Sequence, residues 1–224
     1  MLAEDRRPKT DDRVLFMRLF IALDIDEEIR QRIRTFLEGV RGFAPDARWV
    51  KPESLHVTLK FIGEQPEGSL HALECALAQV SGSPFELSFR GYGFFPTPKS
   101  ARVFWIGIQS GPQLSALAGA IDNATATLDI AREDRPFSPH LTLARRGGGS
   151  GSPRKQKTDS PNKVFQRWSE KLAAMTSHEF GTMTAREFFL YQSQLSRDGS
   201  RYTKLKRFPL RDETRAVNID PNKP

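Results

Sequence analysis

His56-Val57-Thr58-Leu59 and His140-Leu141-Thr142-Leu143 repeat one pattern, in which a histidine and a threonine alternate with apolar residues. Such alternation predicts a β-strand, because successive side chains of a strand point to opposite faces. Each copy would bury its apolar residues and present an imidazole and a hydroxyl side by side on the other face. Imidazole titrates close to neutral pH, so two such strands facing one cleft predict a proton-transfer site suited to cutting a phosphodiester.

The composition is that of a globular protein with one sizeable core. The chain has 224 residues, of which 38% are hydrophobic, and 16 are phenylalanine. Its single cysteine, Cys75, excludes an intramolecular disulfide and fits a reducing cytosol; its apolar helical surroundings predict a buried thiol. Residues 1–13 lack the apolar core of a signal peptide, and no stretch approaches the roughly 20 apolar residues that span a bilayer. We therefore expect a soluble, cytoplasmic protein without membrane contact.

The formal charge of +7 is unevenly distributed. Residues 145–167 contain seven lysines and arginines against one aspartate, and residues 197–211 contain six against one. Basic charge is thus concentrated just after the second histidine pattern and near the C-terminus. This distribution favours a phosphate-rich ligand, although solubilising surface charge would look the same.

Hydrophobic periodicity predicts two similar halves, each with a strand, a helix and a histidine strand, and therefore an α+β fold. We expect a single domain over 14–211 with flexible tails at 1–13 and 212–224, and a mobile Gly/Ser-rich loop at 146–163. Two equivalent histidine strands related by a pseudo-twofold axis would line a shared cleft. The strands are expected at 14–23, 54–62, 85–89, 101–108, 139–144, 187–194 and 201–210, and the helices at 26–40, 70–80, 112–128 and 165–175.

One His-x-Thr pattern would be weak evidence, because a histidine on a strand is more often structural and so loose a pattern can recur by chance. Two copies within 48–63 and 135–145, together with 18–23, 102–107, 188–193 and 201–205, are more specific. With these motifs the chain resembles the bacterial RNA 2′,3′-cyclic phosphodiesterases of the 2H phosphoesterase superfamily. The resemblance implies a two-lobed fold with antiparallel sheets lining a central groove and helices outside.

The resemblance also implies roles for particular residues. His56 and His140 match the family's catalytic histidines, Thr58 and Thr142 its phosphate-binding threonines, and Arg145 a phosphate-contacting arginine. Opening a 2′,3′-cyclic phosphate in line requires a base on one side of phosphorus and an acid on the other. We assign His140 as the base and His56 as the acid, although pseudosymmetry leaves the reverse open. The expected product is a 2′-phosphomonoester.

The remaining expectations concern ligands and partners. Phe61 and Tyr191 are the aromatics expected to line the groove, where they could contact a base. We expect no cofactor and no metal, since two histidines without a third ligand nearby make a poor zinc site. The expected partner is RNA or a nucleotide with a 2′,3′-cyclic phosphate, and the protein is expected to be a monomer without an obligatory protein partner. Two alternatives stay open: another 2H activity, on ADP-ribose cyclic phosphate or 2′-5′ linkages, and a non-catalytic nucleotide-binding module.

Overall fold

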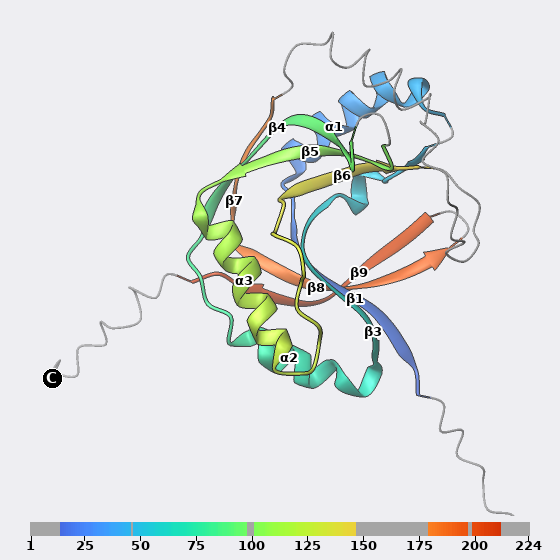
Figure 1. Cartoon of the computed structure of the whole chain (residues 1–224). Helices are drawn as coiled ribbons and strands as arrows, with labels where there is room; N and C mark the ends of the chain where they lie inside the picture. The colour runs from blue at the N-terminus through green and yellow to red at the C-terminus, as the bar shows by residue number, and fades with distance from the viewer. Residues whose placement is uncertain (1–13, 46, 98–100, 147–178, 197–198, 212–224) are drawn as a thin grey trace, which may run out of the picture.

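The computed structural model describes residues 14–45, 47–97, 101–146, 179–196 and 199–211 (Figure 1). The expected tails, nearly all of the expected loop at 146–163 and the expected helix at 165–175 lie outside these residues. Three short 3₁₀ turns, η1 (Arg41–Phe43), η2 (Pro52–Ser54) and η3 (Glu67–Ser69), accompany the main elements. The main elements are β1 (Phe16–Asp24), α1 (Glu27–Val40), β2 (Arg48–Trp49), β3 (His56–Pro66), α2 (Leu70–Ala78), β4 (Phe85–Phe95), β5 (Val103–Ser110), α3 (Pro112–Ala126), β6 (His140–Arg145), β7 (Glu179–Ala185), β8 (Glu187–Ser196) and β9 (Gly199–Pro209).

The strands form one curled antiparallel sheet in the order β7-β4-β5-β6-β3-β1-β8-β9, with β2 added beside β6 (Figure 1). The order is symmetric about its centre, since β3 corresponds to β6, β1 to β5, β8 to β4 and β9 to β7. The two four-stranded halves meet where Val57 of β3 pairs with Leu141 of β6. The expected α+β, two-lobed architecture is confirmed.

The two halves of the sequence exchange elements. β4 pairs with β5 of the second half, and β8 pairs with β1 of the first half. The helices cross over as well: Phe36 of α1 packs on Phe104 of β5 and Phe180 of β7, whereas α3 packs against β3 and α2 (Figure 1). Each half therefore needs the other for its core, which explains why the duplicated sequence forms a single sheet.

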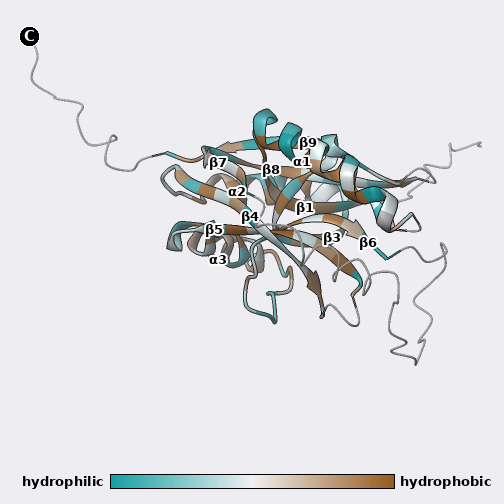
Figure 2. Ribbon diagram, turned by 90° about the horizontal axis from the view of Figure 1, so that it is seen from above, coloured by the Kyte–Doolittle hydropathy of each residue, from teal (hydrophilic) through white to brown (hydrophobic). Residues whose placement is uncertain are grey.

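The main core lies between the helices and one face of the sheet. Val57, Leu59, Leu141 and Leu143 are at most 4% exposed and belong to this core. The opposite face carries a smaller cluster of Phe20, Ala22, Phe189 and Tyr191. The alternation seen in the sequence is thus the alternation between these two faces. Helix α1, which covers the core, carries both hydrophilic and hydrophobic residues (Figure 2). None of the helices in the described segments is long and apolar enough to cross a membrane.

Several expectations about individual segments were wrong. The strands expected to end at residues 62 and 89 are longer, because β3 continues through Gly63 and β4 through Gly91. These glycines have φ of +87° and +68° and lie beside register shifts in the strand pairing, a backbone conformation that glycine adopts easily. Gly181 likewise lies within a strand, β7, at a φ of +120°. The short strand β2 was not predicted, because two residues are too few to show the alternation of polar and apolar side chains. Cys75, expected to be buried, is exposed and lies 3.6 Å from Nε2 of His71.

Candidate active site

The two histidine strands are neighbours in the sheet and run antiparallel. Val57 pairs with Leu141, so continuing this register by one residue sets His56 opposite Thr142 and His140 opposite Thr58. The four side chains mark the corners of a rectangle, with the histidines on one diagonal. Typical strand dimensions make that diagonal about 8 Å between Cα atoms, which leaves room for a phosphoryl group between the two rings.

Both strands carry a bulge at the same place, and the bulge changes which later residue shares the histidine face. Leu59 is an extra residue in the pairing of β3 with β1, and Leu143 is one in the pairing of β6 with β5. Strict alternation would return the fourth residue after each histidine to the histidine face. Instead Ala144 is buried, whereas Phe61 and Arg145, each five residues after a histidine, are exposed.

The two imidazoles are held in the same way. Nδ1 of His56 lies 2.8 Å from the carbonyl oxygen of Ser54, and Nδ1 of His140 lies 2.8 Å from that of Ser138. A carbonyl oxygen can only accept a hydrogen bond, so Nδ1 carries the proton in both rings. Nε2 of each neutral ring therefore keeps a free lone pair, and Nε2 is the atom available for proton transfer.

Both histidines are neutral in the free protein at neutral pH. Burial lowers the pKa of His56 to about 4, with Arg145 and His140 adding to the effect against the opposing influence of the Ser54 carbonyl and Asp24. Burial and Arg145 likewise lower the pKa of His140. Arg145 thus acts on both rings, as expected for a cation beside the space between them. An anion bound there would offset Arg145 and raise both pKa values.

Aromatic rings pack against each imidazole. Phe20 lies 4.8 Å from the ring of His56, and Tyr202 lies 5.1 Å from it at an angle of 90°. On the other half, the ring of Phe95 lies 5.0 Å from His140 at 84°. Together with the Nδ1 hydrogen bonds, these ring contacts hold each imidazole in one orientation.

A cavity of about 420 Å³ opens beside His56. It is lined by residues of β1, η2, β3, β8 and β9, and no residue of β6 contributes to its wall. The pseudosymmetry of the two histidines is therefore broken by their surroundings. The lining residues are Asp24, Glu53, Ser54, Leu55, His56, Tyr191, Arg201, Tyr202, Thr203 and Lys204.

The two aromatic residues expected at the site differ in accessibility. Phe61 is 57% exposed on the histidine face, with its ring 6.3 Å from Phe20. Tyr191 lines the cavity, but it is 6% exposed and its ring stacks on Phe20 at 5.0 Å. Burial also raises the pKa of Tyr191, which keeps its phenol protonated. Phe61 offers an open ring face, whereas Tyr191 forms part of a wall.

Comparison with known proteins follows the same division into halves. A family model described as LigT like Phosphoesterase matches residues 23–105 and residues 106–202, so each matched segment holds one histidine pattern. The chain belongs to the LigT-like phosphoesterase family. The RNA 2′,3′-cyclic phosphodiesterase of Archaeoglobus fulgidus is 36% identical over 192 residues, covering 86% of this chain and 99% of the relative. That of Escherichia coli K12 is 31% identical over 195 residues, covering 86% and 96%.

Solved structures of proteins with similar sequences share the fold. A Thermus thermophilus protein superposes with a TM-score of 0.68 at 31% identity, covering 88% of this chain and all of that chain. Escherichia coli LigT complexed with 3′-AMP superposes with a TM-score of 0.67 at 28% identity, with the same coverage. The relatives come from archaea and bacteria alike, so the similarity is to the family and does not single out its bacterial members.

Sequence reasoning missed several residues at this LigT-like site. Asp24, Lys204 and Tyr202 lie in the cavity wall with His56, yet no role was predicted for them, although Tyr202 and Lys204 belong to the 201–205 stretch that contributes to the resemblance. The serine two residues before each histidine was a usable signal, because Ser54 and Ser138 recur at the same offset and supply the carbonyl groups that orient the rings. Within the described segments, no group of three or more histidine, cysteine, aspartate or glutamate residues is arranged to hold a metal ion.

Proposed function

We propose that this protein hydrolyses RNA 2′,3′-cyclic phosphate ends to 2′-phosphomonoesters by acid–base catalysis with two histidines and no metal. The observation that carries the proposal is the pairing of β3 with β6, which sets His56 and His140 on one diagonal and Thr58 and Thr142 on the other. Relatives that share most of the chain's length are named RNA 2′,3′-cyclic phosphodiesterases.

In the proposed reaction, a water oxygen attacks phosphorus in line with the bond to O3′. Nε2 of His140 takes a proton from the water, the new P–O bond forms, the P–O3′ bond breaks, and Nε2 of His56 gives its proton to O3′. The hydroxyl groups of Thr58 and Thr142 donate hydrogen bonds to the non-bridging oxygens, and Arg145 stabilises the charge that develops there. Each proton transfer contributes about 10²–10⁴-fold to the rate.

The surroundings of the two histidines support His56 as the acid. In-line geometry sets the ribose on the side of the acid, because its O3′ is the leaving atom. The cavity that could receive a nucleoside opens beside His56. Asp24, paired with His56 across β1 and β3, adds a carboxylate that favours the protonated ring, whereas Gly107 holds the corresponding position opposite His140. Substrate phosphate would supply the further increase in pKa that protonation of His56 requires.

Phe61 and Tyr191 are proposed to contact different parts of the nucleoside. Phe61 presents an exposed ring on the histidine face and is proposed to stack on the base, an interaction worth about 1–3 kcal/mol. Tyr191 is proposed to bound the cavity with its edge, since its face is already occupied by Phe20. RNA or a nucleotide with a 2′,3′-cyclic phosphate is the proposed partner.

The deciding experiment is product analysis. An RNA oligonucleotide ending in a 2′,3′-cyclic phosphate, and adenosine 2′,3′-cyclic phosphate, are incubated with the protein and the products are separated by chromatography and assigned by phosphorus NMR. We expect the 2′-phosphomonoester from both substrates. Predominant 3′-phosphate would reject the leaving-group assignment, and no turnover of either, with turnover of ADP-ribose cyclic phosphate or a 2′-5′ linkage, would reject the proposed substrate.

A further inference from the structure

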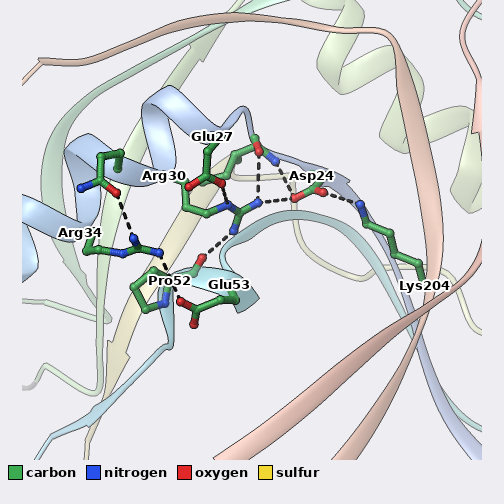
Figure 3. Close-up of polar contacts among 9 residues, drawn as sticks. Asp24, Glu27, Arg30, Arg34, Pro52, Glu53 and Lys204 are labelled. Atoms are coloured by element: carbon green, nitrogen blue, oxygen red, sulfur yellow. Dashed lines mark hydrogen bonds and ion pairs between the residues drawn. The ribbon is translucent and has the colours of Figure 1, made fainter.

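Arg30 of α1 is a buried arginine whose contacts converge on the approach to His56. Only 8% of the residue is exposed. Its guanidinium donates hydrogen bonds to Oδ1 of Asp24 at 2.7 Å, to the carbonyl oxygen of Ile25 at 3.1 Å and to that of Pro52 at 2.5 Å (Figure 3). Its Nε lies 3.2 Å from a carboxylate oxygen of Glu27. The arginine thereby ties the end of β1 to η2.

The position of η2 matters because this turn carries the group that orients His56. Arg30 holds the carbonyl oxygen of Pro52 at the start of η2, and Ser54 at its end accepts the hydrogen bond from Nδ1 of His56. A single residue, Glu53, thus separates the clamped carbonyl from the one that fixes the imidazole. The hydrogen bonds of Arg30 are thus connected to the ring of His56 through Pro52, Ser54 and Asp24.

Asp24 is the second member of the network. Its Oδ1 accepts hydrogen bonds from Arg30 and from the backbone N–H of Ile25 at 2.9 Å, and its Oδ2 pairs with Nζ of Lys204 (Figure 3). Burial opposes ionisation of Asp24, but Lys204, the Ile25 N–H and Arg30 outweigh it and lower the pKa of this carboxyl. Lys204 also lies over the ring of Phe189, 4.2 Å from its centroid. The carboxylate is therefore held charged and fixed beside His56.

We propose that Arg30, Asp24 and Lys204 form a positioning network that holds His56 in the orientation of the general acid and favours its protonation once substrate phosphate is bound. This inference rests on the proposed function. The network serves one histidine, because Gly107 replaces Asp24 opposite His140. The charged and titratable groups that face His56 are Asp24 from β1, Glu53 from η2, His140 and Arg145 from β6, Tyr191 from β8, and Arg201, Tyr202 and Lys204 from β9.

Two substitutions in the network should move the titration of His56 in opposite directions. Asp24→Asn removes the anion that favours the protonated ring, so the pKa of His56 should fall by about one unit. Lys204→Met removes a cation and leaves Asp24 less neutralised, so the pKa of His56 should rise. The readout is the chemical shift of the His56 ring followed by NMR against pH, with His140 as an internal reference that should move much less.

Activity provides the second readout. The alkaline limb of kcat against pH, which reports loss of the proton from the acid, should move to lower pH in Asp24→Asn and to higher pH in Lys204→Met, and kcat of Asp24→Asn should fall by at least tenfold. Glu28→Gln, which removes an exposed carboxylate paired with Arg32 on the same helix, is the matched control for the first variant. Lys206→Met, on the neighbouring exposed position of β9, is the control for the second.

The outcomes separate this inference from the proposed function. Shifts of the His56 resonance in opposite directions support the network even if adenosine 2′,3′-cyclic phosphate is not turned over. Equal titration of His56 in the wild type and both variants overturns it even if the protein hydrolyses that substrate. Should Asp24→Asn fail to fold because Arg30 is left buried beside a neutral amide, Lys204→Met decides alone, since Lys204 is exposed and its loss leaves the buried contacts of Arg30 intact.

Discussion

At the scale of single residues, each histidine donates from Nδ1 to the carbonyl oxygen two residues before it, which leaves Nε2 to react. We predict that His56→Ala and His140→Ala each reduce hydrolysis of adenosine 2′,3′-cyclic phosphate by about 10²–10⁴-fold. Folding should be retained, because both side chains lie on the face opposite the main core. Initial rates and thermal unfolding measure the two effects.

The same rates measured after incubation with EDTA test the metal-free part of this prediction, and unchanged turnover is expected. Near-normal rates in either alanine variant would contradict the two-histidine mechanism. Complete loss of activity with EDTA, restored by zinc, would show that a metal takes part.

The lowered pKa of His56 makes stability depend on pH. The ordinary pKa of histidine is 6.5, and that of His56 in the folded protein is about 4. Between these values the unfolded chain binds a proton that the folded chain does not, so the free energy of unfolding falls as the pH drops from about 6.5 to about 4. The contribution has an upper limit of about 3 kcal/mol. His56→Asn should lose this part of the acid sensitivity, as measured by urea unfolding from pH 7.5 to 4.5. Parallel curves for the two proteins would contradict the assignment.

At the scale of secondary-structure elements, the bulge at Leu143 turns Arg145 toward the histidine face. We predict that Arg145→Met lowers kcat/KM by about 10–100-fold, because a charge-assisted contact to phosphate is lost. Arg145 lowers the pKa of both histidines, so its removal should raise both and move the acidic limb of kcat/KM to higher pH. Arg146→Met, at the position just after the end of β6, is the matched control and should change neither quantity appreciably. An equal loss in both variants would show that only general basic charge matters.

A second element-scale feature anchors the segment that leads to His140. Lys60, 2% exposed on the core side of β3, pairs with Asp122 of α3 and donates a hydrogen bond to the carbonyl oxygen of Ala131 at 2.8 Å. Lys60→Met would leave Asp122 and that carbonyl without their buried partner, and we predict a loss of about 2–4 kcal/mol in the free energy of unfolding. The double variant Lys60→Met/Asp122→Leu should recover part of this loss. Urea unfolding of the four members of this cycle measures the coupling, and additive losses would show that the pair does not interact.

At the scale of the whole molecule, the halves share strands and helices, so neither His-Thr strand can be placed without the opposite half. Residues 147–162 lie outside the described part of the chain, and their Gly, Ser and Lys content offers little apolar surface to bury. We predict that deleting them changes the midpoint of thermal unfolding by only a few degrees and leaves turnover of a cyclic mononucleotide unchanged. Binding of longer RNA should weaken at low salt, because basic residues are lost. A large fall in the unfolding midpoint would show that this segment packs against the domain.

The sequence by itself determined the direction of the key side chains and the duplication of the chain. Alternation along 56–59 and 140–143 was enough to predict which residues are buried, because side-chain direction along a strand is a local property. Tertiary structure decided the rest. The register of β3 against β6, the bulges that turn Phe61 and Arg145 to the histidine face, and the contact of Lys204 with Asp24, 180 residues away, all depend on pairing and packing across the whole sheet. The distance between two such segments depends on all the elements packed between them, so no local sequence pattern predicts it.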